Sequence, residues 1–288
     1  MFVDVPDGRR IEFLVAGPED GMPLVYHYGT PSAAVPYPPM FDEAARRGLR
    51  TVVFSRPGYG ESTAQPGRSV ADVAADTAAV LDALGARRFV TIGKSGGGPH
   101  ALACAALLPD RCAAAASVAG VAPFGAEGLD WLAGMGKENI EEFGATIAGP
   151  DELTLYLEEQ AKVLSTVRAT DIVEAFGDLV SDVDKRALTG DFAEFVAASF
   201  RRAVVHGIEG WRDDDLAFAR DWKFRPGEGA PVAIWQGGQD RMVPYAHGEW
   251  LAENVPGARA HLLLDEGHLS LLIRVYGDVL DDLLDMAH

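Results

Sequence analysis

The sequence predicts an α/β fold in which a mainly parallel, doubly wound sheet carries helices on both faces. Short apolar runs rich in β-branched residues alternate with longer helical segments along most of the chain. This alternation is typical of strand–helix–strand units, which build parallel sheets. Glycines follow several predicted helices, as at Gly48 and Gly85, and the end of a helix favours glycine. Because crossovers between parallel strands are right-handed, we expect helices to cover both faces of the sheet.

The first part of the chain begins with an antiparallel hairpin and continues with parallel strands. Residues 10–16 alternate apolar and polar side chains and are expected to pair with residues 2–4 across a Pro-Asp-Gly turn. Ser69 and Asp72 form a capping pair that begins the helix before Gly85. In chain order, the elements predicted after the hairpin are a strand at 23–27, a helix near 40–47, a strand at 50–54 and a helix that ends at 84.

The clearest local pattern is a strand, a sharp turn and a helix around Ser95. The turn reads Gly93-Lys94-Ser95-Gly96-Gly97 and lies between the apolar run 89–92 and an alanine-rich helical segment at 101–108. It fits the Gly-x-Ser-x-Gly pattern of a nucleophile elbow. Side chains at positions 93 and 97 would collide with the neighbouring strand and helix, so both positions need glycine. The backbone N–H of Gly96, at the start of a helix, is a candidate donor to an oxygen that becomes negatively charged.

The strand–helix alternation stops between a strand predicted at 113–119 and the next one at 231–235. We therefore predict a core domain of residues 1–122 and 227–288, with a helical cap inserted as residues 123–226. An insertion at the carboxyl edge of a parallel sheet lies where ligands bind in such folds. The helices predicted in the cap are 153–165, 169–176, 191–206 and 216–222, the last with Asp213, Asp214 and Asp215 at its N-terminus. The core then resumes with a helix at 244–254, a strand at 259–264 and a closing helix.

Three residues that suit acyl-transfer chemistry each follow a predicted strand. Ser95, Asp240 and His268 are far apart in the sequence but are expected to meet at the carboxyl edge of the sheet. The chain order Ser, Asp, His is that of the α/β-hydrolase arrangement. Serine alone is a weak nucleophile at neutral pH, so His268 would take its proton. Asp240 would orient the imidazole ring and stabilise its protonated form.

The chain resembles the α/β-hydrolase superfamily, and within it the capped bacterial serine hydrolases that include proline iminopeptidases, esterases and haloperoxidase-like enzymes. The matching motifs are Tyr28-Gly29-Thr30-Pro31, Arg56-Pro57-Gly58-Tyr59-Gly60-Glu61-Ser62, Gly93 to Gly97, Gly238 to Pro244, and Gly267-His268. The resemblance implies that the backbone N–H groups of Thr30 and Gly96 form an oxyanion hole. It also implies that neither a metal nor an organic cofactor is needed. Tyr28 stands where these proteins usually have a histidine, a difference that leaves the backbone donor in place.

We expect the cap to form a lid over Ser95 and to supply part of the substrate-binding surface. The candidate binding residues are Tyr28, Lys94, Trp131, Phe143 and Tyr156. The charge of Lys94 is expected either to reach water or a cap carboxylate, or to lie close enough to His268 to disfavour the imidazolium form. In the second case the same charge could attract an anionic group of the substrate. Acidic side chains of the cap could hold a substrate amine, as iminopeptidase caps do, although their helical spacing favours a solvated face. These acids are Glu127, Glu138, Glu141 and Glu142.

The predicted function is hydrolysis of a small-molecule ester or amide through a Ser-His-Asp triad and an acyl-enzyme. Three alternatives stay open: N-terminal peptide cleavage of the proline iminopeptidase type, hydrolysis of a carbon–carbon bond, and non-catalytic binding of a small ligand on the same fold. A serine at the elbow disfavours dehalogenase and epoxide hydrolase reactions, because those branches of the superfamily use an aspartate nucleophile.

Charge and composition limit the partners of the protein. The formal net charge of −18 argues against nucleic acid and anionic membranes, since both would repel the chain. No apolar run reaches membrane-spanning length, and the N-terminus lacks a signal-peptide pattern. Cys104 and Cys112 are expected to be buried thiols in a reducing environment. We therefore expect a cytoplasmic protein that acts on a small-molecule substrate and holds no metal.

Overall fold

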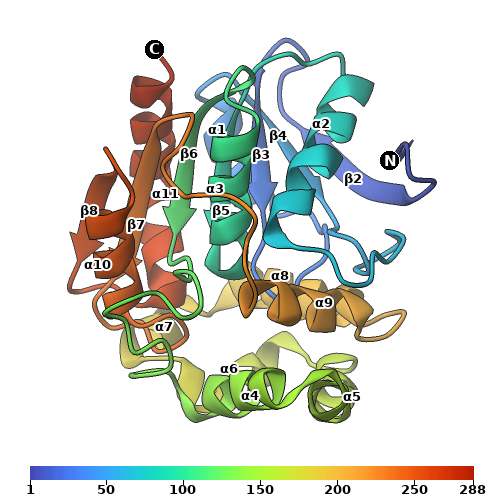
Figure 1. Cartoon of the computed structure of the whole chain (residues 1–288), viewed down its shortest axis with the longest axis vertical. Coiled ribbons are helices and arrows are strands. Elements are labelled where there is room, and N and C mark those ends of the chain that lie inside the picture. Colours follow the sequence, from blue (N-terminus) through green and yellow to red (C-terminus); the bar gives the residue numbers. More distant parts are fainter.

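The computed structural model describes all residues, 1–288, and contains one eight-stranded sheet (Figure 1). The strand order is β1-β2-β4-β3-β5-β6-β7-β8, in which the pairs β1–β2 and β2–β4 are antiparallel and all other pairs are parallel. The predicted mainly parallel α/β sheet is therefore confirmed. The strands are β1 (Phe2–Asp4), β2 (Arg10–Ala16), β3 (Met22–His27), β4 (Leu49–Phe54), β5 (Phe89–Lys94), β6 (Cys112–Val118), β7 (Val232–Gly237) and β8 (Arg259–Leu263).

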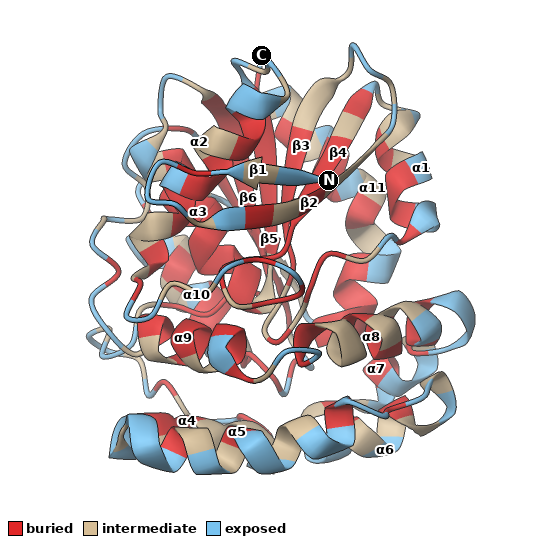
Figure 2. Cartoon of the chain, turned by 90° about the vertical axis from the view of Figure 1, so that its right-hand side faces the viewer, coloured by how far each residue is buried: buried red, intermediate tan, exposed pale blue.

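Helices cover both faces of this sheet, as predicted. Side chains alternate along β3, so that Leu24 and Tyr26 join one hydrophobic core and Val25 joins the core on the opposite face. One face carries α1 (Pro38–Ala45) and α11 (His268–Met286), and the other carries α2 (Val73–Ala83), α3 (Gly98–Leu107) and α10 (Tyr245–Asn254) (Figure 2).

No helix is both long enough and apolar enough to cross a lipid bilayer.

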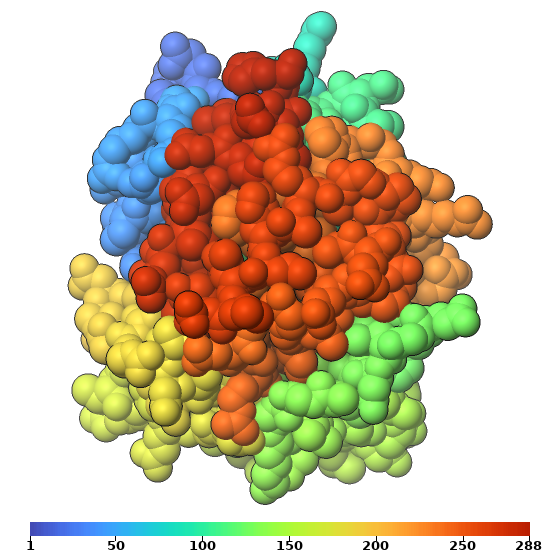
Figure 3. Space-filling model, turned by 90° about the vertical axis from the view of Figure 1, so that its left-hand side faces the viewer, coloured from blue at the N-terminus to red at the C-terminus, as the bar shows by residue number.

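The residues between β6 and β7 form only helices, which lie beyond one end of the sheet strands. We keep the name cap for residues 123–226. Figure 1 shows the cap below the sheet, and Figure 2 shows α4, α5 and α6 as its outer layer, beneath α8 and α9. On the face in Figure 3, the green and yellow cap segments pack directly against the orange and red C-terminal segments. The cap helices are α4 (Lys137–Ala148), α5 (Pro150–Leu164), α6 (Ile172–Phe176), α7 (Asp182–Ala187), α8 (Gly190–Ala203) and α9 (Glu209–Phe218).

The structure corrects the prediction for the three consecutive acids of the cap. Because α9 begins at Glu209, Asp213, Asp214 and Asp215 lie inside the helix rather than at its N-terminus. All three are buried, and none has more than 3% of its surface exposed. An acidic run is typical of a solvated helix N-terminus, but these side chains face the interior, where two core arginines bind the middle one. The helices α4 and α7 are also absent from the predicted elements.

Candidate active site

Ser95 lies at the apex of the turn between β5 and α3. Its φ of 56° falls in the left-handed region, which is strained for a residue other than glycine. The flanking glycines are required sterically. A Cβ at Gly93 would lie 2.0 Å from the carbonyl oxygen of Gly97, and a Cβ at Gly97 would lie 2.1 Å from that of His27. The turn presents Ser95 to two cavities under the cap, both of which it lines.

Asp240 and His268 form a buried hydrogen-bonded pair. Asp240 lies in the loop after β7, and His268 is the first residue of α11. Asp240 Oδ2 lies 2.7 Å from His268 Nδ1. The backbone N–H groups of Met242 and Val243 each donate to Asp240 Oδ1 at 2.8 Å and hold the carboxylate in place. Since the carboxylate accepts a hydrogen bond from Nδ1–H, the neutral imidazole carries its lone pair on Nε2, where it can act as a base.

Ser95 and His268 line the same cavity, but no hydrogen bond joins their side chains in this structure. The structure thus brings Asp240 and His268 into direct contact and places Ser95 on the wall that His268 also lines. Contacts between a nucleophile and its base are often loose without substrate and tighten when substrate binds. The arrangement is suited to proton transfer from Ser95 once the cavity is filled.

Thr30 and Gly96 lie side by side next to Ser95. A Cβ at Gly96 would lie 2.4 Å from Thr30 Oγ1, and a Cβ at Gly29 would lie 3.2 Å from that of Ser95. The backbone N–H of Thr30 donates to no other protein atom, so it is available to an oxygen in the cavity. Gly96 lies in the 3₁₀ turn that opens α3, where backbone N–H groups lack partners within the helix. Both residues are therefore positioned as candidate oxyanion donors.

The sequence did not predict a buried ion cluster next to the loop that carries Thr30. Asp214 Oδ2 accepts a hydrogen bond from Thr30 Oγ1 at 2.7 Å and from Arg56 Nη2 at 2.6 Å. Arg68 Nη1 donates to the other carboxylate oxygen, also at 2.6 Å. Arg56 additionally donates to the carbonyl oxygens of Tyr28 and Gly29, the residues just before Thr30. The cluster therefore ties the core loop that carries Thr30 to α9 of the cap.

A second cap carboxylate, Asp184 of α7, holds the helix that carries His268. Its two oxygens accept hydrogen bonds from the backbone N–H groups of His268 (3.0 Å), Leu269 (2.7 Å) and Ser270 (2.9 Å). Ser181 Oγ also donates to Asp184 at 2.9 Å. These N–H groups lie at the start of α11, where they have no partner within the helix and favour a negative charge. No motif in the sequence predicts this contact, because Asp184 lies 84 residues before His268.

The two cavities meet at Ser95, and four of the predicted binding residues line them. The larger cavity, of about 120 Å³, is lined by Phe143 and Tyr156 of the cap. The smaller cavity, of about 80 Å³, is lined by Tyr28 and Lys94 of the core. Both cavities have mainly hydrophobic walls, which suits the apolar parts of a small organic substrate.

Trp131 is the predicted binding residue that the structure places at neither cavity. It is 5% exposed, and its ring packs edge-on against Phe143 with 4.6 Å between the ring centroids. Its indole N–H donates to the carbonyl oxygen of Ala122 at 2.7 Å. Trp131 is therefore a core residue at the base of the cap and supports Phe143 from behind.

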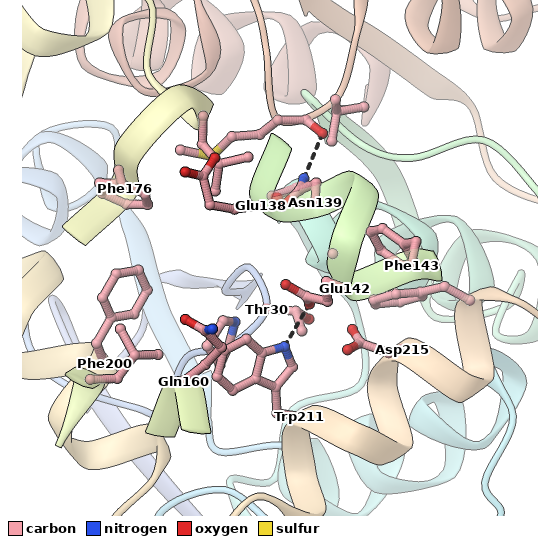
Figure 4. Close-up of a pocket in the computed structure, with 18 of the residues that line it drawn as sticks. Thr30, Glu138, Asn139, Glu142, Phe143, Gln160, Phe176, Phe200, Trp211 and Asp215 are labelled. Carbon is pink, nitrogen blue, oxygen red and sulfur yellow. Dashed lines mark hydrogen bonds between the residues drawn. The ribbon is translucent and has the colours of Figure 1, made fainter. Parts of the chain in front are cut away.

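The cap glutamates form the predicted solvated face only in part. Glu127 and Glu141 are exposed, whereas Glu138 and Glu142 line the larger cavity. Figure 4 shows Glu142 of α4 close to Asp215 of α9, with the indole N–H of Trp211 directed at the glutamate. That N–H lies 2.7 Å from Glu142 Oε1, but neither oxygen of Asp215 has a hydrogen-bond partner.

Burial raises the pKa of both Glu142 and Asp215, and for Asp215 the nearby glutamate raises the pKa further. Two carboxyl groups so placed cannot both ionise easily without a counter-charge. This acidic pair on the cavity wall is a feature that helical spacing alone did not predict, because Asp215 comes from a different helix.

No group of three or more His, Cys, Asp or Glu side chains is arranged to hold a metal ion. Cys104 and Cys112 are buried free thiols.

Curated relatives match part of the chain. A non-heme chloroperoxidase from Streptomyces lividans is 36% identical over 149 residues, which are 51% of this chain and 54% of that protein. Epoxide hydrolase B from Mycobacterium tuberculosis is 29% identical over 150 residues, 50% of this chain and 42% of that protein. The chain thus spans about half the length of the curated relatives it matches.

Solved structures and a family model match a much larger part of the chain. An esterase from Thermogutta terrifontis superposes with a TM-score of 0.67 at 18% identity, covering 100% of this chain and 98% of that one. At this level of identity the likeness concerns the fold. The family model for the alpha/beta hydrolase fold matches residues 22–275. Because that match covers most of the sequence and the observed sheet agrees with it, the chain belongs to the α/β-hydrolase family.

Proposed function

We propose that this protein is a serine hydrolase that cleaves a small-molecule ester or amide through an acyl-enzyme on Ser95. In the first step Ser95 Oγ forms a bond to the substrate carbonyl carbon while His268 takes the hydroxyl proton. Asp240 stabilises the imidazolium, and the N–H groups of Thr30 and Gly96 bind the oxygen that becomes negative. The bond to the alcohol or amine then breaks, and His268 gives the proton to that leaving group.

Water completes the cycle by the same route in reverse. His268 takes a proton from water as the water oxygen bonds to the acyl carbon. The Ser95 oxygen leaves, recovers the proton from His268, and the carboxylic acid product is released. Neither acylation nor deacylation of Ser95 changes an oxidation state.

The 2.7 Å contact between Asp240 and His268 carries this proposal. It holds the buried ring of His268, which lines the same cavity as Ser95 in its strained elbow. A bifunctional esterase/perhydrolase from Acinetobacter calcoaceticus, 31% identical over 124 residues, supports an ester as the substrate class.

Replacing Ser95 with alanine tests the proposal. Ser95→Ala is expected to lower kcat for a 4-nitrophenyl ester by at least about 10³-fold and to abolish labelling by a fluorophosphonate probe. Ser165→Ala is the matched control, because Ser165 is exposed at the end of α5, and it should keep both activities. Turnover or labelling that persists in folded Ser95→Ala protein would refute the mechanism.

A second candidate, cleavage of an N-terminal residue from a peptide-like amide, is favoured by the acidic pair. Glu142 and Asp215 line the cavity at Ser95, and both oxygens of Asp215 are buried without a partner. A protonated substrate amine between these carboxyls would supply the missing hydrogen-bond donors and the counter-charge.

Aminoacyl 4-nitroanilides with a free amine, compared with their N-acetylated forms, distinguish this candidate from a general esterase. An amine subsite predicts cleavage only of the free-amine compounds, and a loss of about tenfold or more in kcat/KM for Asp215→Asn. The control is Glu141→Gln, an exposed acid on the same cap helix as Glu142. Equal rates for free and acetylated compounds would exclude the aminopeptidase alternative.

A further inference from the structure

Lys94 differs from every other lysine in the chain. The other four lysines each have a carboxylate oxygen within 4 Å, at distances between 2.5 and 3.6 Å. The ammonium group of Lys94 makes no ion pair and no hydrogen bond, although the residue is partly buried beside Ser95. A positive charge away from water normally requires a negative partner, because desolvation of an unpaired charge is costly. No carboxylate of the protein pairs with Lys94 at contact distance.

The cavity that Lys94 lines contains no acid that could pair with it. Its wall contains aromatic and aliphatic side chains, three serines, one threonine and two basic residues, Lys94 and His268, but no aspartate or glutamate. Ser95 lines the same cavity, so a molecule attacked by Ser95 would extend one half toward Lys94. The cavity is therefore suited to an anionic group carried by the substrate, with apolar walls around the adjoining carbon chain.

A second unpartnered donor lines this cavity. Tyr26 on β3 is 2% exposed, and its hydroxyl has no hydrogen-bond partner. β3 and β5 are adjacent parallel strands in which Tyr26 is paired with Ile92. Since side chains alternate along a strand, Ile92 and Lys94 point to the same face of the sheet as Tyr26. Lys94 and Tyr26 therefore offer two hydrogen-bond donors to the same cavity.

The protonation states of both groups support this role. Burial lowers the pKa of Lys94 to about 8, against an opposing effect of Asp240 and Asp184, so the amine is still mainly protonated at pH 7. Burial raises the pKa of Tyr26, so its hydroxyl keeps the proton that it would donate. Two donors and no arginine match a carboxylate better than a phosphate, which needs more donors and counter-charge.

We propose that the smaller cavity is a carboxylate-binding subsite, and that the substrate is an ester or amide carrying a carboxylate in the half that contacts Lys94 and Tyr26. This inference deepens the proposed function and rests on it, because Ser95 is taken as the group that attacks the substrate. It assigns the substrate class as a half-ester or half-amide of a dicarboxylic acid, or as an O-acylated hydroxy acid or N-acylated amino acid whose own carboxylate is free.

Paired esters that differ only in one charge test the subsite. 4-Nitrophenyl hydrogen adipate and 4-nitrophenyl methyl adipate differ by a carboxylate in the acyl half. 4-Carboxyphenyl butyrate and its methyl ester differ by a carboxylate in the leaving group. With spontaneous hydrolysis subtracted, the wild-type protein should prefer the charged member of at least one pair by about 10- to 100-fold in kcat/KM. A ratio near one in both pairs would overturn the proposal.

Variants then connect the preference to its residues. Lys94→Met removes the charge at similar side-chain length. The ratio of kcat/KM for the carboxylate ester to kcat/KM for its methyl ester should then fall to about one or below. Tyr26→Phe removes only the hydroxyl and should lower the ratio by about three- to tenfold. Lys162→Met is the matched control, because it removes the same charge from an exposed lysine of α5, and its ratio should equal that of the wild type. A full preference in Lys94→Met would overturn the proposal, provided that thermal unfolding shows a folded protein.

Binding without turnover separates this inference from the proposed function. Calorimetric titration of adipate into Ser95→Ala protein should give a binding signal that disappears in the Ser95→Ala, Lys94→Met double variant. If no ester is hydrolysed but adipate binds through Lys94, the subsite stands and the proposed reaction fails. If esters are hydrolysed without charge preference and adipate does not bind, the reaction stands and the subsite is refuted.

Discussion

Asp214 is the cap residue that contacts the core loop carrying the candidate oxyanion donor Thr30. It is fully buried and accepts hydrogen bonds from Arg56, Arg68, Tyr59 and Thr30. Burial alone would raise the pKa of Asp214, but the two arginines hold it below its ordinary value of 3.8. Because the folded-state pKa is depressed, the stabilisation is fully present above pH 3.8 and is lost as the pH falls below that value.

Asp214→Asn should therefore damage both stability and turnover. Removing the charge leaves Arg56 and Arg68 buried without a counter-ion, and we expect the free energy of unfolding to fall by about 3 kcal/mol or more. kcat for an ester should also fall, by about tenfold, because Thr30 loses the partner that positions it. Chemical denaturation and steady-state kinetics measure the two effects.

The neighbouring Asp213→Asn is the matched control for that experiment. Asp213 is also buried, but its nearest basic group, Arg212, lies 3.5 Å away, and burial raises the pKa of Asp213. Since burial already disfavours the charge of Asp213, a neutral amide at position 213 should cost about 1 kcal/mol or less, the size of one lost hydrogen bond. Equal losses of unfolding free energy in the two variants would mean that the pairing of Asp214 with the arginines does not contribute specially to stability.

At the scale of the helices, α11 depends on a residue of the cap for its first turn. Asp184 of α7 accepts the N–H groups of His268, Leu269 and Ser270. The helix that carries the candidate base is thereby fixed to the helical layer that covers the cavities. Cap and base are expected to move as one unit.

Asp184→Asn should disturb the position of His268 more than the binding of substrate. An amide nitrogen replaces one acceptor at the helix N-terminus, and we expect a loss of about 2 kcal/mol in stability. kcat should fall by about tenfold while KM changes less than threefold, because the cavity walls keep their side chains. Steady-state kinetics measures this split.

Asp182→Asn, on the same helix but with 87% of its side chain exposed, is the control and should change neither constant. If Asp184→Asn changed KM and left kcat intact, the carboxylate would act on the cavity rather than on the base.

The sequence predicted the elements of the core better than the contacts of the cap. The core strands are recognisable in the sequence as apolar runs between turn residues. The elbow is recognisable by its glycines, because a Cβ at Gly93 or Gly97 would clash with the neighbouring backbone. Asp214 and Asp184 carry no such local signature. Their partners lie 158 and 84 residues away in the chain, so only the folded structure reveals that these acids are buried and paired rather than solvated.

At the scale of the whole molecule, the proposed carboxylate subsite opposes the overall charge. The chain carries a formal net charge of −18, which repels an anionic substrate at a distance, whereas Lys94 would attract it at contact. Long-range repulsion between exposed charges is screened by salt, and a contact inside a cavity is screened much less.

Raising NaCl from 10 to 150 mM should therefore increase kcat/KM for the charged ester of the preferred pair. The methyl-capped ester, which carries no charge, serves as the control and should change little. Stopped-flow or plate kinetics at fixed pH measures both substrates. A decrease for the charged ester with added salt would show that local positive charge, rather than the net charge, dominates its approach.

The most direct test of the central claim is detection of the acyl-enzyme itself. Wild-type protein mixed with excess 4-nitrophenyl ester and quenched in acid within the first turnovers should gain the mass of one acyl group. Peptide mapping should place that group on Ser95, and Ser95→Ala protein should gain no mass. An ester hydrolysed at full rate with no acyl group on Ser95, or with the adduct on another residue, would contradict the account.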